Sequence, residues 1–345
     1  MASQGKMQLV VPDCAGSEWL AKEITDYCTK NLHVLCQAPT VYVSSPADRT
    51  AYLERLQGAA IIMPFFKGAP LDREILNSIK SHARLVSIIG PGGQNIDMDA
   101  AEEYAIPVVF TNHAATGPVA EMTIGLMLQL ARDLPYLSYA GGQTGCPGSK
   151  GVLPEHFWRT SYSSGLYGRS LGLVGLGETG QNVAQIAKAM GMDVFAWSPN
   201  LTQEKAEQCG CRYLALPELM KTSDVVSLHL RLGETTEGLI NRQLLETMKE
   251  GACLINTSRG RLVDEAALQD LLRQNRIRAG LDVFSEEPLG PRSPWFSVPN
   301  TVLTPHAAWQ SQATIHSFLE NAKKNTLSFF QTRARRPRNE KFRRY

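Results

Sequence analysis

The sequence predicts an α/β protein with two doubly wound parallel-sheet domains and a cleft between them. Short apolar runs alternate with amphipathic helical patterns along most of the 345 residues, an order typical of parallel strands joined by crossover helices. A strongly apolar pattern at 119–131, followed by a loop-like stretch at 141–165, divides this alternation into two sets. A chain of this length holds about two domains, which agrees with that division.

The first set of elements occupies residues 1–118. Short apolar runs predict strands, and apolar residues at helical spacing predict the helices between them. The strands are expected at 8–11, 59–63, 85–89 and 106–110, and the helices at 18–30 and 71–82.

The second set begins after residue 168. Before it, residues 119–131 predict a long apolar helix, and 141–165 predict a loop because they are rich in Gly, Ser, Thr and Pro. The later strands are expected at 170–175, 193–197, 225–229, 252–256, 279–283 and 301–303, and the later helices at 181–189, 265–274 and 312–330.

Composition excludes several classes of protein. With 43% hydrophobic and 20% charged residues, the chain is not intrinsically disordered. We expect no membrane span and no signal peptide, because no apolar run is long enough. The seven cysteines are scattered without CxxC spacing, which predicts reduced thiols, a cytoplasmic location and no metal site.

Positive charge gathers at the end of the chain. Residues 332–345 carry seven basic side chains and one acid, a net +6 within a total of +2, so the remaining body is at −4. That body has no basic excess of the kind that binds nucleic acid. The tail at 331–345 is a solvated end, a contact for nucleic acid or an anionic surface, or an import signal.

A glycine loop carries the first functional signal. The spacing GxGxxG follows an apolar strand and opens a helix, which is the context of a dinucleotide-binding turn. The first glycine makes the tight turn, the second lets the backbone approach a pyrophosphate, and the third lets helix and strand pack closely. A glycine-rich turn without a ligand is the alternative. The residues expected to bind the cofactor here are Gly175, Gly177, Glu178, Thr179 and Gly180.

The form of the cofactor stays open. A carboxylate at the end of the second strand would bind the ribose 2′-hydroxyl and favour NAD. Ser198 stands at that place, followed by Asn200, and the nearest cation is Lys205. Both NAD and NADP therefore fit the sequence.

Three later segments place polar residues just after apolar strands. Arg259, Glu287 and His306 each follow a different strand, so all three are expected at the carboxyl edge of one parallel sheet. Arg259 can grip a carboxylate with its planar fork. His306 can exchange a proton with a carbonyl oxygen, and Glu287 can fix the tautomer of that ring. Each residue alone has a plainer interpretation, as a surface Arg, a solvated acid or a capping His.

These motifs resemble the D-isomer-specific 2-hydroxyacid dehydrogenase family. The matching blocks are the glycine loop, residues 256–260, residues 281–288 and residues 304–306. The resemblance implies that Arg259, Glu287 and His306 are catalytic. It implies that the backbone of Gly92 and Gly93 meets the substrate carboxylate, and that Thr257 and Asp282, which lie in the blocks, contribute to cofactor binding.

The resemblance also implies an organisation. Two Rossmann-like or flavodoxin-like domains are expected: a substrate-binding domain of residues 1–118 plus 312–330, and a nucleotide-binding domain of 119–311 that includes the crossing helix and the 141–165 loop. The family usually builds part of a homodimer contact at that loop.

Departures from the family pattern concern the substrate and cofactor. Arg231 replaces a usual Pro near the expected cofactor, where it either meets a phosphate or points to solvent. Trp309 follows the catalytic His in place of a small residue and is expected to shape the substrate pocket. Phe65 and Phe66 indicate either an apolar substrate side chain or core packing.

The sequence thus predicts an NAD(P)-dependent oxidoreductase (EC 1.1.1.-), similar to glyoxylate and hydroxypyruvate reductases, that reduces a small 2-keto acid to a D-2-hydroxy acid. The alternative is a dinucleotide-sensing, corepressor-like binding protein on the same fold. A formate-type enzyme is disfavoured because relatives of that type carry Gln where Glu287 stands.

Overall fold

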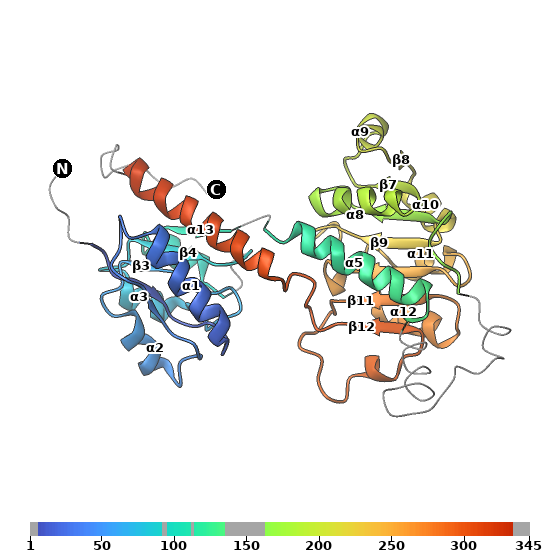
Figure 1. The fold of residues 1–345 in the computed structure, drawn as a ribbon. Helices are drawn as coiled ribbons and strands as arrows, with labels where there is room; N and C mark the ends of the chain where they lie inside the picture. Colours follow the sequence, from blue (N-terminus) through green and yellow to red (C-terminus); the bar gives the residue numbers. More distant parts are fainter. Residues whose placement is uncertain (1–5, 92–94, 112–113, 135–162, 334–345) are drawn as a thin grey trace, which may run out of the picture. The chain divides into compact units, whose positions relative to one another are not determined.

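The computed structural model describes residues 6–91, 95–111, 114–134 and 163–333 (Figure 1). The chain divides into two compact units, because it passes from the first to the second after Ala115 and returns after Gln310. The second unit is Thr116–Gln310. The expected boundaries, after 118 and after 311, lie within a few residues of these points.

The first unit holds a five-stranded parallel sheet in the order β2-β1-β3-β4-β5. Four helices come from the N-terminal part and a fifth, α13, from the end of the described chain (Figure 1). The strands are β1 (Leu9–Val11), β2 (Thr40–Val41), β3 (Ile61–Ile62), β4 (Leu85–Ile88) and β5 (Val108–Phe110). The helices are α1 (Glu18–Asn31), α2 (Arg49–Leu56), α3 (Arg73–Ile79), α4 (Met98–Glu103) and α13 (Gln312–Arg333).

Local sequence sets where these helices begin. Each of the first four starts after a Ser or Asp whose side-chain oxygen accepts a hydrogen bond from a backbone N–H of the first turn. The cap at Asp72 explains why α3 begins at Arg73 and not at Leu71, where the apolar pattern begins.

The second unit holds a seven-stranded parallel sheet in the order β12-β11-β10-β9-β6-β7-β8. Its strands are β6 (Ser170–Val174), β7 (Asp193–Trp197), β8 (Arg212–Tyr213), β9 (Val225–Leu228), β10 (Cys253–Asn256), β11 (Arg278–Leu281) and β12 (Thr301–Leu303). Its helices are α5 (Thr116–Ala131), α8 (Glu178–Ala189), α9 (Gln203–Gln208), α10 (Leu216–Thr222), α11 (Arg242–Thr247) and α12 (Glu265–Arg273), with short 3₁₀ turns at Gly260–Leu262 and Pro294–Ser297.

Helices cover both faces of this sheet. Buried side chains of α5 and α8 form one apolar core with β6, whereas those of α10, α11 and α12 form another with β9 and β10. A parallel sheet buried on both faces is the doubly wound arrangement. The predicted fold class, two parallel α/β sheets, is confirmed.

Several short elements were not predicted from the sequence. Strands β2 and β8 have two residues each, too few for an alternating pattern. The helices that were not predicted, α2, α4, α9, α10 and α11, have eight, six, six, seven and six residues. The expected loop at 141–165 and the tail at 331–345 fall mostly outside the described residues. Within the described part, no helix is both long and apolar enough to cross a membrane.

Candidate active site

The glycine loop follows β6, an inner strand beside the central strand β9. Gly175 has φ +111°, and a Cβ there would lie 2.5 Å from the carbonyl oxygen of His229. At Gly180, a Cβ would lie 2.2 Å from the carbonyl oxygen of Gly175. Neither position therefore accepts a side chain, which is the packing that the first and third glycines of the motif provide.

Gly177 differs from its two neighbours in the motif. A Cβ there would meet no heavy atom within 4 Å, and Gly177 caps α8 without any side-chain hydrogen bond to the first turn. Glu178 and Thr179 begin that turn. Exposed N–H groups at a helix N-terminus are suited to phosphate oxygens, so these residues fit a dinucleotide pyrophosphate.

The end of β7 lies beside the glycine loop. Ser198 Oγ accepts the backbone N–H of Leu176 at 2.9 Å, so the residue in place of the usual acid ties the strand end to the loop. Asn200 and Arg231 are exposed. Arg231 lies two residues beyond His229, whose carbonyl packs against Gly175. No carboxylate stands at residues 198–200 to repel a 2′-phosphate.

His306 and Glu287 form a hydrogen-bonded pair. Nδ1 of His306 lies 2.5 Å from Oε2 of Glu287, and the two side chains are 27% and 29% exposed. The other carboxylate oxygen of Glu287 accepts the backbone N–H of Phe284 at 2.9 Å. The pairing fixes the orientation of the ring and leaves Nε2 for a further partner.

Asp282 holds the segment that carries His306. Its carboxylate is fully buried and accepts hydrogen bonds from Thr304 Oγ1 at 2.6 Å, from the N–H of Ala307 at 2.8 Å and from the N–H of Ala308 at 2.9 Å. His306 itself has φ +52°, an uncommon backbone conformation that these bonds help to hold. Sequence reasoning placed Asp282 only among the cofactor-binding residues and missed this contact.

Arg259 is presented by a rigid turn after β10. The buried Asn256 side chain donates to the carbonyl oxygen of Arg259 at 2.9 Å and accepts the N–H of Ser258 at 3.0 Å. The guanidinium is exposed and donates to the carbonyl oxygen of Ser258 at 2.6 Å. Thr257 Oγ1 lies 2.9 Å from Thr123 Oγ1 on α5. Asn256 belongs to the matching block 256–260, but its two bonds to the Arg259 turn were not predicted.

Strand register brings these groups to one edge. In the parallel ladders Asn256 pairs with both Leu228 and Leu281, Leu281 pairs with Leu303, and Leu228 pairs with Val174. The glycine loop, Arg259, Glu287 and His306 all follow the carboxyl ends of these strands. Trp309 lies half-buried a few residues beyond His306.

The expected substrate loop is only partly described, since Gly92 and Gly93 lie outside the described residues. Before it, Gly90 has φ +136°, and a Cβ there would lie 2.1 Å from the ring of Phe66. The Phe66 ring also lies edge-on to Phe65 at 4.9 Å and to Phe318 at 6.0 Å, between centroids. Phe65 is buried, and Phe66 is partly buried against the core of the first unit.

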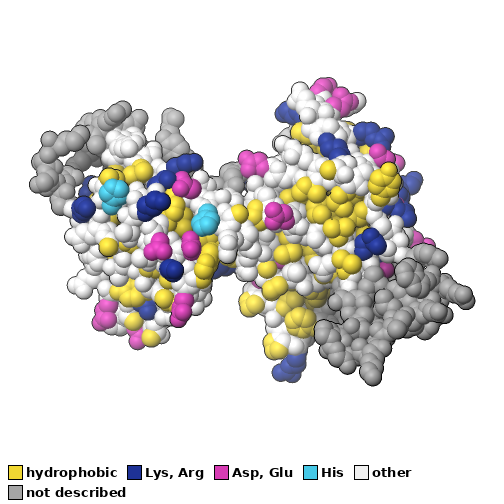
Figure 2. All heavy atoms as spheres, in the orientation of Figure 1, with side chains coloured by type: hydrophobic (Ala, Val, Ile, Leu, Met, Phe, Trp, Pro, Cys, Tyr) yellow, Lys and Arg dark blue, Asp and Glu magenta, His cyan; other side chains and the backbone are white. Residues whose placement is uncertain are grey.

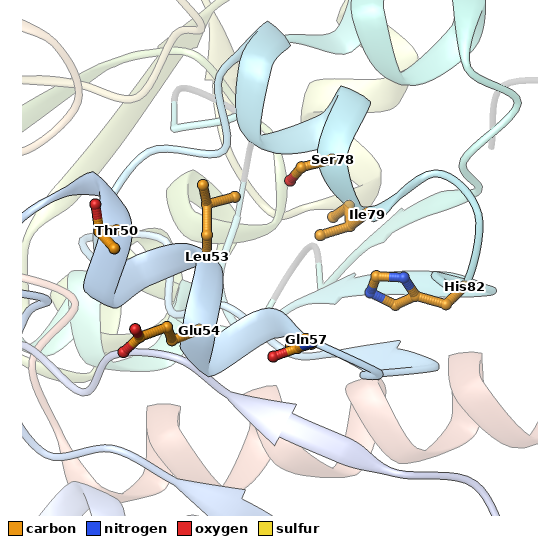
Figure 3. Close-up of a pocket in the computed structure, with 7 residues that line it drawn as sticks. All are labelled: Thr50, Leu53, Glu54, Gln57, Ser78, Ile79 and His82. Carbon is orange, nitrogen blue, oxygen red and sulfur yellow. The ribbon is translucent and has the colours of Figure 1, made fainter.

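A shallow groove of about 280 Å³ lies elsewhere, in the first unit between α2 and α3 (Figure 3). Its His82 ring bonds the carbonyl oxygen of Leu56 at 3.1 Å. It holds none of the predicted site residues. Its lining residues are Thr50, Leu53, Glu54, Gln57, Ser78, Ile79 and His82.

Known proteins are similar to this chain in sequence and in fold. The chain is 34% identical over 280 residues to D-3-phosphoglycerate dehydrogenase of Methanocaldococcus jannaschii, covering 80% of this chain and 50% of that protein. It is 30% identical over 308 residues to hydroxypyruvate reductase of Blautia hydrogenotrophica, covering 88% and 92%. The crystal structure of the TT0316 protein from Thermus thermophilus matches 94% of this chain and 97% of that one, at 31% identity and a TM-score of 0.76. The chain thus spans about half the length of the phosphoglycerate dehydrogenase.

More than half of the chain, residues 124–308, matches the family described as D-isomer specific 2-hydroxyacid dehydrogenase, NAD binding domain. The second unit is accordingly a nicotinamide dinucleotide-binding domain. The chain belongs to the D-isomer specific 2-hydroxyacid dehydrogenase family.

Proposed function

We propose that the protein reduces a small 2-keto acid to a D-2-hydroxy acid, and catalyses the reverse oxidation, with NADH or NADPH. The observation that carries this proposal is the 2.5 Å pair between His306 and Glu287 at the sheet edge that also bears Arg259 and the glycine loop. A proton donor and a carboxylate-binding guanidinium are the two groups that this reaction requires of the protein.

In this mechanism the protein places charge and moves one proton. When bound, the nicotinamide supplies or accepts the hydride. Arg259 pairs with the substrate carboxylate through its planar fork. His306 donates a proton from Nε2 to the carbonyl oxygen in reduction and takes it back in oxidation. Glu287 stabilises the protonated ring through Nδ1, and Asp282 keeps the backbone around His306 in place.

The cofactor would be held by the loop described above. Gly175 and Gly180 shape it, and the N–H groups around Gly177, Glu178 and Thr179 would bind the pyrophosphate. Thr257 and Asp282, which directly follow β10 and β11, would contribute to the cofactor site. The backbone of Gly92 and Gly93 would support the substrate carboxylate, and Trp309 would limit the size of the substrate.

We further propose that NADPH is accepted alongside NADH. Ser198 and Asn200 carry no negative charge, and Arg231 is an exposed cation near the same loop. Ser198→Asp should lower kcat/KM with NADPH roughly 10-fold or more, because a carboxylate would face a 2′-phosphate. Activity with NADH should change far less. Equal losses with both cofactors would contradict this assignment.

The substrate is proposed to be glyoxylate or hydroxypyruvate, since relatives matched over 84% and 92% of their length are named glyoxylate reductase and hydroxypyruvate reductase. The test is the loss of absorbance at 340 nm with these acids, pyruvate and phenylpyruvate, using wild type and His306→Ala. Oxidation of NADH that requires both a keto acid and His306 is expected. Tight NADH binding without turnover of any acid would favour the sensor alternative instead.

A second copy of the chain is the proposed partner. Met122 and Leu128 on α5 are only partly buried, and hydrophobic side chains gather over α5 and α8 on the face drawn in Figure 2. Light scattering on the purified protein should give the mass of a homodimer. A monomer at micromolar concentration would rule out this arrangement.

A further inference from the structure

The segment that carries Glu287 is anchored from outside the predicted site. Ser285 donates two hydrogen bonds to Glu265 at the start of α12: its N–H to Oε1 at 2.6 Å and its hydroxyl to Oε2 at 2.7 Å. The buried Trp295 also donates its indole N–H to Oε2 of Glu265, at 3.3 Å. One carboxylate therefore receives three donors from the 285–295 segment.

This anchor is one residue away from the bond that orients Glu287. Phe284 is the neighbour of Ser285, and its backbone N–H donates to Oε1 of Glu287. The other carboxylate oxygen of Glu287, Oε2, is hydrogen-bonded to Nδ1 of His306. Phe284 is buried, and its ring packs against Trp295 at 5.8 Å between centroids. A shift of Ser285 would move the Phe284 N–H and, through it, the carboxylate that holds the His306 ring.

The same turn also contacts the segment that carries Arg259. A Cβ at Gly260 would lie 1.9 Å from the carbonyl carbon of Phe284 and 2.3 Å from the nitrogen of Ser285. The backbone of the Arg259 turn thus lies directly against the two residues held by Glu265 and its neighbours. Close-packed backbone transmits small displacements, since it has no flexible side chain to absorb them.

We propose that Glu265 is a positioning residue, which sets the placement of Glu287 against His306 and of Arg259 through the Phe284–Ser285 turn. The inference rests on the proposed function of His306, Glu287 and Arg259. Glu265 itself belongs to α12 and bonds the turn, not the reacting groups.

The proposal predicts a change in how readily His306 takes up a proton. The charged and titratable groups on the segments around this ring are Glu287 with its neighbour Glu286, Asp282, Glu265 and Arg292, together with Arg259, which follows the end of neighbouring β10. Of these, only Glu287 bonds the ring. A less firmly held Glu287 stabilises the protonated ring less, so protonation would require a lower pH.

The experiment compares Glu265→Ala and Glu265→Gln with wild type in the full chain. Asp270→Asn is the matched control, because it removes another acid of α12, one that pairs with Arg242 on the surface. The first readout is the NMR titration of the His306 ring, whose signals are identified by their absence in His306→Ala. This titration requires neither cofactor nor turnover. Glu265→Ala should move the midpoint to lower pH, Glu265→Gln should move it less because its amide oxygen still accepts the Ser285 N–H, and Asp270→Asn should leave it unchanged.

The second readout is steady-state reduction of hydroxypyruvate. Glu265→Ala should lower kcat by roughly 10- to 100-fold, as loss of a supporting contact commonly does, while the KM for NADH changes less than about 2-fold. An unmoved His306 midpoint in both Glu265 variants would overturn the proposal. If no variant, wild type included, turns over any keto acid, the proposed function fails, and the NMR midpoint still decides whether Glu265 positions Glu287.

Discussion

At the scale of single residues, the three glycines of the loop have different physical roles. Gly175 and Gly180 are required by the protein itself, because backbone oxygens lie 2.5 Å and 2.2 Å from where a Cβ would be. Gly177 faces open space and has φ −75°, which any residue adopts. The fold therefore does not require a glycine there, and we expect its lack of a side chain to matter for the proposed cofactor.

Alanine substitutions should separate these roles. Gly180→Ala should lower the free energy of unfolding by about 1–3 kcal/mol or more, because the added methyl overlaps backbone. Gly177→Ala should unfold at nearly the wild-type temperature but bind NADH at least about 10-fold more weakly. Thermal melts and fluorescence titration check both. Similar melting losses in the two variants would show that the open space at Gly177 is wrongly assigned.

Residues with a role in a local motif could be predicted from the sequence. The glycine spacing is one such case, and Arg259, Glu287 and His306 each follow an apolar run closely enough to be assigned to one sheet edge. Glu265 could not be predicted, because its partner Ser285 lies 20 residues away in the chain and neither belongs to a recognisable pattern. The three bonds that Asp282 accepts from Thr304, Ala307 and Ala308 were not predicted either, because these donors lie 22 to 26 residues away in the chain.

At the scale of elements, one acid joins the two strands at the centre of the second sheet. Asp224, just before β9, accepts the N–H and hydroxyl of Ser170 in β6 at 2.9 and 2.7 Å, and pairs with Lys249 at 3.0 Å. Burial alone would raise the pKa of Asp224. The bonds from Ser170 and Lys249 outweigh that effect and hold the pKa below its ordinary value.

This interaction should make stability depend on pH in one direction. Because the folded pKa is below the unfolded one, the stabilisation is complete above about pH 4 and is lost as pH falls through the folded value. Asp224→Asn should lower the free energy of unfolding by about 1–3 kcal/mol at pH 7, and the difference should shrink below pH 4. Urea titrations at pH 7 and pH 3 measure it. Glu246→Gln, which removes an exposed pair, is the control. A difference that persists undiminished at pH 3 would contradict the assignment.

Elements were predictable where a pattern was long enough. Strands β7 and β12 have the bounds that were predicted, 193–197 and 301–303. The helix expected at 119–131 begins three residues earlier, at Thr116. The two-residue strands β2 and β8 are defined by pairing with β1 and β7, which are distant in sequence. The two-residue strand β3 was predicted only because it lies inside the longer apolar run 59–63, and β2 and β8 have no such run around them.

At the scale of the whole molecule, the first unit is built from both ends of the described chain. On α13, Ile315, Phe318, Leu319 and Ala322 are buried, and this helix packs on β4, β5 and α1. Asn325 donates to the carbonyl oxygen of Phe110 at 2.9 Å, and His316 pairs with Glu23 at 3.1 Å. The helix is therefore a structural part of the first unit. The second unit is continuous in sequence and has its own cores.

Ending the chain after Gln310 should therefore affect the two units differently. Residues 9–110 should lose protection from hydrogen exchange, because a buried helix of their core is missing. NADH binding should persist, with a Kd within roughly 3-fold of wild type. Ending the chain after Arg333 keeps all of α13 and is the control. Full protection of residues 9–110 in the shorter chain would contradict the role given to α13.

The interrupted first unit also sets an order of events during synthesis. About 195 residues separate Ala115 from Ser311, and a ribosome that adds roughly 5–20 residues per second needs on the order of 10–40 seconds to make them. Throughout that time the sheet of β1–β5 has emerged without α13. The apolar surface that α13 covers in the finished unit stays exposed to solvent during this time, while the second unit is synthesised and can fold. We therefore expect the first unit to complete its fold only after the second unit has been synthesised, which leaves chaperones that interval in which to act.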